Sequence, residues 1–261
     1  MITQIERASL LKKLHIKGDP LLLFNIWDAG SARAIQDIGA KVIATSSWAV
    51  AAAHGCDDGE KLPFDLALAN LKRIVACVDL PVTFDLESGY GQSANEIQII
   101  FSKVIEAGAV GINFEDQIID KEDLYSIEDQ CTRIKAIHEL AVKASIPIFI
   151  NARTDIFLKT DWPKHNDTHL EEAIHRASAY AQSGATGFFA PGLTDAQYIE
   201  KLCKHSPIPI NIMVMPNTPS LKELSKLGVA RISFGPGPYH QAMNALKETG
   251  QKAYNELTSG K

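Results

Sequence analysis

Carboxylate, guanidinium and amide side chains stand at the ends of consecutive apolar segments of this sequence. Asp85 and Glu87 end one such segment, Glu115 ends the next, and Asn151 and Arg153 lie in the one after that. Side chains two residues apart project from the same face of an extended strand, so Asp85 and Glu87 share a face, as do Asn151 and Arg153. If these faces meet, three carboxylates lie close together and require a counter-charge. Oxygen ligands without Cys or His select a hard cation, so the pattern predicts a Mg²⁺ or Mn²⁺ site.

The same residues also have plain structural explanations. An acidic residue at a strand end can face water or cap the next helix, and Arg153 can form an ion pair with Glu115. In the functional interpretation, Arg153 binds a substrate carboxylate or phosphonate through two parallel N–H bonds. Three acids on consecutive strands, together with Arg153, favour the functional interpretation.

Two further segments carry weaker signals. Ser46 and Ser47 end an apolar segment and Trp48 begins a helical one, so their hydroxyl and backbone N–H groups could bind an anion or simply cap that helix. Asp58 lies in a turn by composition, and on its own it reads as a solvated side chain.

The segment 89–94 matches the G-x-G-x-x-A pattern of dinucleotide-binding loops. The strand before it ends in two acids, which would repel a pyrophosphate. The sequence therefore disfavours a dinucleotide cofactor.

Eight short apolar segments alternate with helical ones, in which apolar residues recur at i, i+3 and i+4. Parallel strands joined by crossover helices give this alternation, because a tight hairpin cannot join parallel neighbours. Odd-numbered strands are entered through proline and even-numbered ones after glycine; this suits a closed barrel with alternating core layers, and ordinary turn chemistry explains it equally well. The predicted strands are 21–27, 41–47, 81–87, 111–116, 147–154, 187–191, 209–214 and 231–236.

These segments predict the α/β class and a (β/α)₈ TIM barrel. We expect one domain over residues 1–261, with an amphipathic N-terminal helix at about 3–15 and C-terminal helices after about residue 238.

The composition excludes several classes of protein. Of the 261 residues, 46% are hydrophobic and 22% are charged, and the net charge of −5 includes no basic block, so no nucleic-acid partner is expected. The four cysteines are scattered, which gives neither a zinc spacing nor a disulfide framework. No signal-like stretch or run of 18 apolar residues occurs, so we expect no membrane contact and a cytoplasmic location.

The combination of several motifs resembles the phosphoenolpyruvate mutase/isocitrate lyase superfamily. The resemblance implies a (β/α)₈ barrel, often with the eighth helix exchanged between subunits, and hence a homo-oligomer, a dimer or tetramer. It also implies Mg²⁺, small 2-oxo or 2-hydroxy acid substrates, and cleavage of C–C or P–C bonds through an enolate. The motifs, spread over about residues 20–240, are 27–33 (WDAGSAR), 45–47 (TSS), 55–59 (GCDDG), 85–91 (DLESGYG), 115–117 (EDQ) and 151–155 (NARTD).

The resemblance assigns roles to single residues. Asp85 would bind Mg²⁺ directly, and Asp58, Glu87 and Glu115 would hold its water ligands. The acids Asp58 and Glu115 would also act in catalysis together with Arg153.

The substrate side of the site follows in the same way. Ser46, with the backbone of Ser47 and Trp48, would cradle a substrate carboxylate or phosphonate. Arg153 would hold the substrate from the far side, and Asn151 is a further predicted substrate-binding residue.

The loop after the fourth predicted strand departs from the family pattern. Isocitrate and methylisocitrate lyases carry a K-[KR]-C-G-H segment there, and the mutase has a P-K-T-N-like run, whereas residues 117–125 read QIIDKEDLY. We expect 117–127 to gate the site, because its mixed charges leave it little to bury.

The reaction that needs least from this loop is cleavage of a C–C bond in a small 2-oxo or 2-hydroxy di- or tricarboxylate, by decarboxylation or a retro-aldol step. The sequence leaves two alternatives open. One is P–C bond chemistry on a phosphonopyruvate-like substrate, and the other is a non-catalytic metabolite-binding protein.

Overall fold

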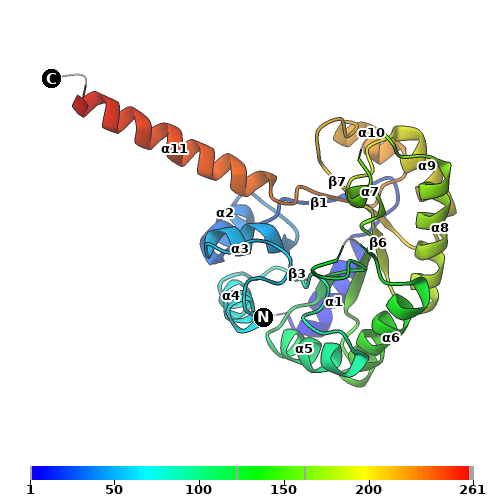
Figure 1. Ribbon diagram of the computed structural model, residues 1–261. Helices are drawn as coiled ribbons and strands as arrows, with labels where there is room; N and C mark the ends of the chain where they lie inside the picture. The colour runs from blue at the N-terminus through cyan, green and yellow to red at the C-terminus, as the bar shows by residue number, and fades with distance from the viewer. Residues whose placement is uncertain (1, 122, 162, 259–261) are drawn as a thin grey trace.

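Eight parallel strands form a nearly closed barrel in the computed structural model, which describes residues 2–121, 123–161 and 163–258 (Figure 1). Hydrogen-bonded neighbours follow the order β1-β8-β7-β6-β5-β4-β3-β2. The remaining gap closes just beyond β1 and β2, where the N–H of Ile26 donates to the carbonyl of Ala44 over 2.8 Å. The predicted α/β barrel is confirmed. Its strands are β1 (Leu21–Leu23), β2 (Ile43–Ala44), β3 (Val82–Asp85), β4 (Gly111–Glu115), β5 (Phe149–Arg153), β6 (Gly187–Phe189), β7 (Ile210–Met213) and β8 (Arg231–Ser233).

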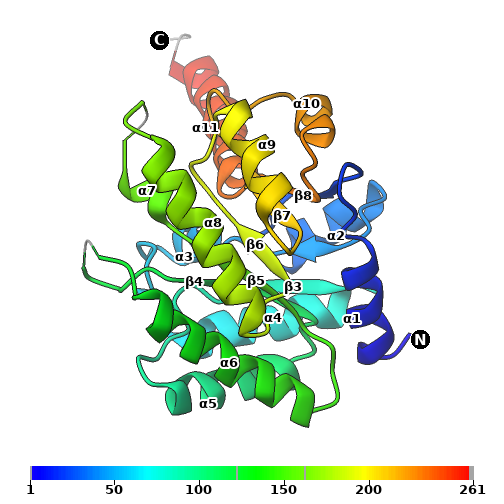
Figure 2. The same ribbon diagram turned by 90° about the vertical axis from the view of Figure 1, so that its right-hand side faces the viewer.

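Helices connect successive strands and surround the barrel. Figure 2 shows α6, α8 and α9 side by side along its outer surface, where α6 packs on α8 and α8 on α9. The connecting helices are α2 (Ala29–Asp37), α3 (Ser47–Ala53), α4 (Phe64–Cys77), α5 (Ala94–Glu106), α6 (Ile127–Lys143), α7 (Ile156–Lys159), α8 (Asp167–Gln182), α9 (Ala196–His205) and α10 (Leu221–Lys226).

The G-x-G-x-x-A segment forms the turn between β3 and the start of α5. Gly89 has a φ of +101°, and a Cβ there would come within 2.8 Å of the Phe114 ring. The side chain of Ser93 accepts from the N–H of Glu96, and the carboxylate of Glu96 accepts from the N–H of Ser93, which makes a capping box. The glycine and serine positions of this motif therefore have structural explanations.

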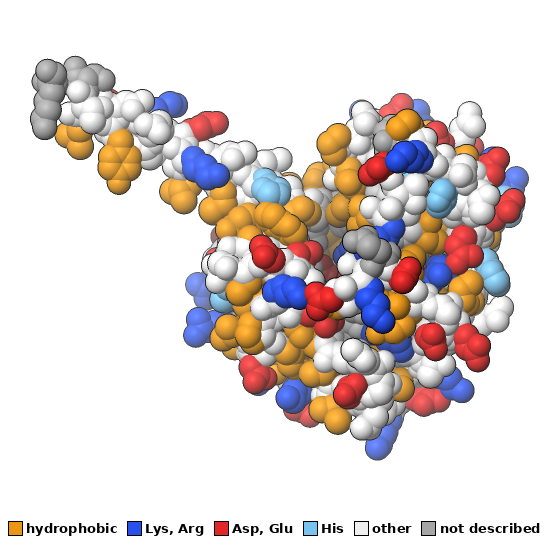
Figure 3. All heavy atoms as spheres, viewed as in Figure 1, with side chains coloured by type: hydrophobic (Ala, Val, Ile, Leu, Met, Phe, Trp, Pro, Cys, Tyr) orange, Lys and Arg blue, Asp and Glu red, His pale blue; other side chains and the backbone are white. Residues whose placement is uncertain are grey.

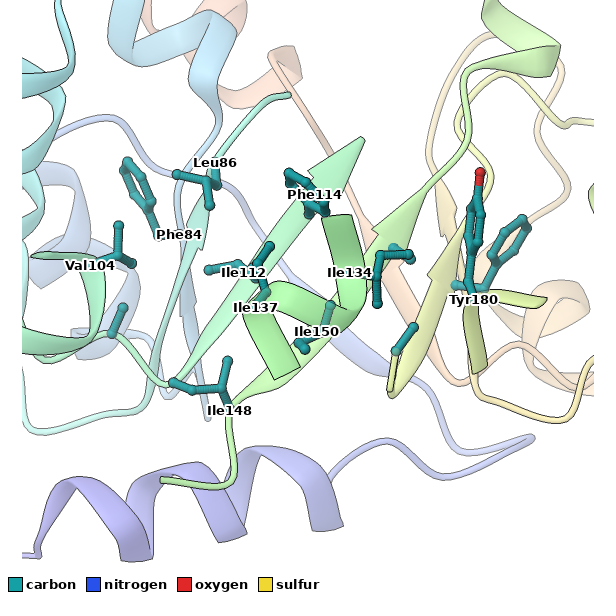
Figure 4. Close-up of a cluster of buried hydrophobic side chains, with 14 of the residues drawn as sticks. Phe84, Leu86, Val104, Ile112, Phe114, Ile134, Ile137, Ile148, Ile150 and Tyr180 are labelled. Atoms are coloured by element: carbon teal, nitrogen blue, oxygen red, sulfur yellow. The ribbon is translucent and has the colours of Figure 1, made fainter. Parts of the chain in front are cut away.

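Apolar side chains fill two regions of the barrel. On the outer faces of the strands, Phe84, Ile112 and Ile150 pack against the helices (Figure 4). Inside the barrel, at the amino ends of the strands, Phe149 packs in a second cluster with Leu11 of α1 (Gln4–Lys13). Helix α1 therefore closes the amino end of the barrel, and the carboxyl end is left for a site.

The chain after β8 forms a single helix, α11 (Gly237–Thr258), where the sequence predicts helices after about residue 238. It extends away from the barrel instead of covering β8 (Figure 1), and Pro238 is its one buried residue in the part of the chain that the structure describes. None of the described helices is both long enough and apolar enough to cross a membrane.

Candidate functional site

A cavity of about 180 Å³ opens at the carboxyl ends of the strands. It is the place where the carboxyl-end loops of a parallel barrel meet. Six of the residues predicted from the sequence line it together: Ser46, Ser47, Trp48, Asp58, Asp85 and Arg153.

Asp85 is held from one side only. Its Oδ2 accepts hydrogen bonds from both the N–H and the hydroxyl of Ser47, each 3.0 Å long. Its backbone N–H donates to the hydroxyl of Thr45. The other carboxylate oxygen, Oδ1, is buried and has no hydrogen-bond partner. A buried carboxylate oxygen without a partner is costly, and a bound cation would remove that cost.

Ser46 and Ser47 have different roles: one caps the next helix, and the other binds Asp85. The hydroxyl of Ser46 caps α3 by accepting from the N–H of Ala49 over 3.5 Å. The N–H and hydroxyl of Ser47 are committed to Asp85. Trp48 packs its ring against Tyr239 and His240 at the start of α11. The sequence motif therefore orients Asp85 as well as lining the cavity.

Arg153 is bound by two carboxylates. Its Nη1 lies 2.7 Å from Oε2 of Glu115, and its Nε and Nη2 donate to the two oxygens of Asp155 over 2.5 and 2.8 Å. The structural ion pair with Glu115 is thus confirmed. A guanidinium has five N–H groups, so one on each terminal nitrogen remains for a ligand.

Glu87 lies behind the cavity wall rather than in it. Its carboxylate accepts from the hydroxyl of Tyr90 and from the N–H of Glu60, each over 2.6 Å. Burial raises the pKa of Glu87 to about 7, although the Tyr90 hydrogen bond opposes this shift. Its φ of +53° places the residue in the left-handed region, in the turn that follows β3.

The cavity has an excess of negative charge. Burial and the neighbouring charge of Asp85 raise the pKa of Asp58, which keeps an exposed side at the rim. Burial also raises the pKa of Glu115, despite the opposing charge of Arg153. In both cases burial and neighbouring acids oppose the ionised form, and a bound cation would favour it.

No three acidic, histidine or cysteine side chains among the described residues converge closely enough to hold a metal ion by themselves. The unpartnered Oδ1 of Asp85 offers one direct ligand. This arrangement fits Mg²⁺, which keeps several waters and binds few protein oxygens directly.

Asn151 lies beneath the cavity and does not line it. Its Nδ2 donates to Oδ1 of Asn113 over 2.9 Å. Asn113, which pairs with Asn151 in register on the neighbouring strand β4, lines the cavity instead.

The cavity is also lined by residues with no role predicted from the sequence: Asn25, Asn113, Phe189, Met213 and Ser233. Asn25 holds the barrel seam, because it donates to the carbonyl of Thr45 and accepts from the N–H groups of Phe234 and Gly235. The sequence signal that could have pointed to Asn25 is a polar amide within the apolar segment 21–27.

The two ends of the loop expected to act as a gate are bonded to each other. Gln117 and Leu124 form an antiparallel bridge, and the N–H of Tyr125 donates to the carbonyl of Asp116 over 2.7 Å. Between them, Asp120 forms an exposed ion pair with Lys61. Gating by this segment stays a prediction.

Comparison with known proteins identifies the family. A model of the phosphoenolpyruvate phosphomutase family matches residues 11–253. The chain belongs to this family. Its barrel is of the phosphoenolpyruvate mutase/isocitrate lyase type, as the sequence resemblance implied.

Three relatives of this phosphoenolpyruvate phosphomutase family member are similar to it over most of its length. A solved protein of Burkholderia cenocepacia J2315, provisionally named a phosphonomutase, is 44% identical, with a TM-score of 0.94 over 96% of this chain and 99% of that one. An uncharacterised protein of Mycobacterium tuberculosis H37Rv is 32% identical over 89% of this chain and 84% of its own length. Oxaloacetate decarboxylase of Pseudomonas entomophila L48 is 27% identical over 85% of this chain and 75% of its own.

Proposed function

We propose that this protein is a Mg²⁺-dependent lyase that cleaves a C–C bond in a small 2-oxo or 2-hydroxy acid, with decarboxylation of a 2-oxo dicarboxylate as the leading reaction. The observation that carries the proposal is the buried, unpartnered Oδ1 of Asp85, in the same cavity as Arg153. A site with an acidic side for a cation and a guanidinium for an anion suits a chelating carboxylate substrate.

The chain would hold the metal through Asp85, with Asp58, Glu87 and Glu115 on its water ligands. Bound Mg²⁺ would supply Lewis-acid stabilisation of an enolate. Ser47 fixes the Asp85 carboxylate through its N–H and hydroxyl. The two remaining N–H groups of Arg153 would bind a substrate carboxylate.

The size and the apolar wall of the cavity favour a small substrate that loses a carboxylate group. A volume of about 180 Å³ is below the range of about 300–1,000 Å³ that is typical of drug-sized sites. Phe189 and Met213 give part of its wall an apolar character. A carboxylate placed against such a wall is poorly hydrated, which favours its departure as CO₂.

The loop after β4 supports decarboxylation over the other cleavages. It has no Cys or His between residues 117 and 127 that could protonate a leaving group. The similarity to an oxaloacetate decarboxylase points in the same direction.

The test is incubation of the protein with Mg²⁺ and oxaloacetate, 2-methylisocitrate or dimethylmalate, followed by ¹H NMR. We expect enzyme-dependent pyruvate, and we expect Asp85→Asn to abolish it while the exposed neighbour variant Asp57→Asn retains it. Absence of any product, in a protein that still binds oxalate tightly, would favour the non-catalytic metabolite binder. Absence of both turnover and oxalate binding would contradict the site assignment.

P–C bond chemistry is the second candidate, because the family model is named for a phosphoenolpyruvate phosphomutase and the 44% identical neighbour for a phosphonomutase. ³¹P NMR of phosphonopyruvate incubated with the protein and Mg²⁺ distinguishes the two. Conversion of the phosphonate signal, with the carboxylic acids unreacted, would replace the leading proposal.

A further inference from the structure

A polar layer crosses the barrel interior between the apolar cluster at α1 and the cavity. The middle of such a barrel is ordinarily filled by Val, Ile and Leu. Here the buried residues Asn113, Asn151, Asn211 and Arg231 occupy it, at no more than 6% exposure each. A layer of this kind is costly unless its hydrogen bonds are used.

Asn113 is the member of this layer that reaches the cavity. Its Oδ1 accepts from Nη2 of Arg231 and from Nδ2 of Asn151, each over 2.9 Å. A guanidinium can only donate, so the bond from Arg231 identifies the accepting atom as the amide oxygen. With Oδ1 occupied twice, the Nδ2 donor of Asn113 is left for another partner. Asn113 pairs in register with Asp85 on the neighbouring strand and lines the same cavity.

Arg231 is not explained as a structural ion pair. It is 1% exposed, and no acid among the described residues lies within ion-pair distance of it. Its Nε and Nη1 have no hydrogen-bond partner. A buried charge with a single side-chain partner costs stability, so the bond to Asn113 calls for a functional reason.

We propose that Asn113 is a substrate-binding residue whose Nδ2 donates to an oxygen of the bound 2-oxo acid beside Asp85, and that Arg231 is the positioning residue that fixes this orientation. The inference rests on the proposed function. It makes the amide an uncharged donor near Asp85, where a second cation in contact with the substrate would compete with the metal.

Oxalate binding in the presence of Mg²⁺, measured by calorimetry, tests the proposal without turnover. In Asn113→Asp, both acceptor bonds to Arg231 and Asn151 can persist, but the cavity-facing donor becomes an acceptor. We expect oxalate affinity to fall by about 10- to 100-fold, as for loss of a hydrogen bond to a charged group. The exposed variant Asn95→Asp is the matched control and should bind as the wild type does.

A double-mutant cycle separates positioning from mere structural support. Arg231→Met should weaken oxalate binding by about tenfold in the wild type but have no further effect in the Asn113→Ala background, because Arg231 acts through Asn113. An equal loss in both backgrounds would overturn the positioning role, and unchanged binding in Asn113→Asp would overturn the donor role. Wild-type protein that neither binds oxalate nor turns over the acids would instead overturn the proposed function and this inference together.

Discussion

The guanidinium of Arg153 connects the substrate side of the site to two buried acids. It lies between Glu115 and Asp155, whose side chains are 6% and 1% exposed. Lysine keeps the charge but cannot bond both carboxylates in one plane. We therefore expect Arg153→Lys to lose about 2 to 4 kcal/mol of unfolding free energy and most of its affinity for oxalate. Urea unfolding and calorimetry measure the two effects.

The exposed variant Arg33→Lys, which makes the same exchange on α2, should leave both quantities unchanged. Arg153→Lys with the stability of the wild type would show that Glu115 and Asp155 do not depend on the fork of Arg153.

Site residues could be predicted from the sequence where a charged side chain stands at an inward position of a strand. Asp85 and Arg153 could be found because a charged residue inside a barrel strand needs a reason. Asp155 and Tyr90, which bind Arg153 and Glu87, could not be assigned. They lie just after β5 and β3, in turns where the strand period no longer gives the direction of a side chain. Asn113 and Arg231 lie far apart in the chain, and their bond depends on closure of the barrel.

The packing of the segment after α1 against the barrel is expected to depend on pH, because it includes a buried histidine. His15 follows α1, stacks on Phe149 with ring centroids 3.7 Å apart, and bonds the carbonyl of Leu11 through Nδ1. Burial, followed by the charge of Arg231, lowers the pKa of His15 to about 3. His15 is therefore protonated below about pH 6.5 in the unfolded chain but stays neutral in the folded chain down to about pH 3.

This difference predicts a stability loss on acidification. The contribution of His15 is fully present above pH 6.5 and falls by about 1.4 kcal/mol per pH unit as the pH drops toward 3. His15→Phe keeps a ring against Phe149 and removes the titration, so its stability should fall less steeply than that of the wild type between pH 6 and 4. Chemical unfolding across this range measures both slopes, with the exposed His175→Phe as control. Parallel slopes for the wild type and His15→Phe would contradict the assignment.

The order of the elements was predictable, but their ends and directions were less so. Each observed strand lies within its predicted segment, because buried parallel strands are continuous apolar runs. The strands are shorter than predicted since polar residues such as Asn25 already belong to the loops of the site. The direction of α11 could not be read from the sequence, because its apolar spacing would equally allow packing on the barrel.

At the scale of the whole molecule, α11 and a groove beside β1 both expose apolar side chains. Leu246, Tyr254 and Leu257 of α11 are 65%, 73% and 78% exposed, and Figure 3 shows apolar side chains along one edge of this projecting helix. An isolated helix of this kind gains little stability in water. Beside β1, an apolar groove of about 510 Å³ includes Leu22 and Ile38, which are 48% and 78% exposed.

The groove is lined by β1, by the end of α2 and by the segment after α1, and α11 extends away from its own barrel (Figure 1). We therefore predict that the groove receives α11 of a second copy. Wild-type protein should then elute as a dimer or tetramer in light-scattering chromatography. Leu246→Asp combined with Leu257→Asp should shift it toward the monomer, because both changes place a charge in the apolar contact. The control Lys252→Asp changes an exposed residue on the other side of α11 and should leave the assembly intact. A monomeric wild type, or a double variant that remains assembled, would show that α11 does not hold the copies together.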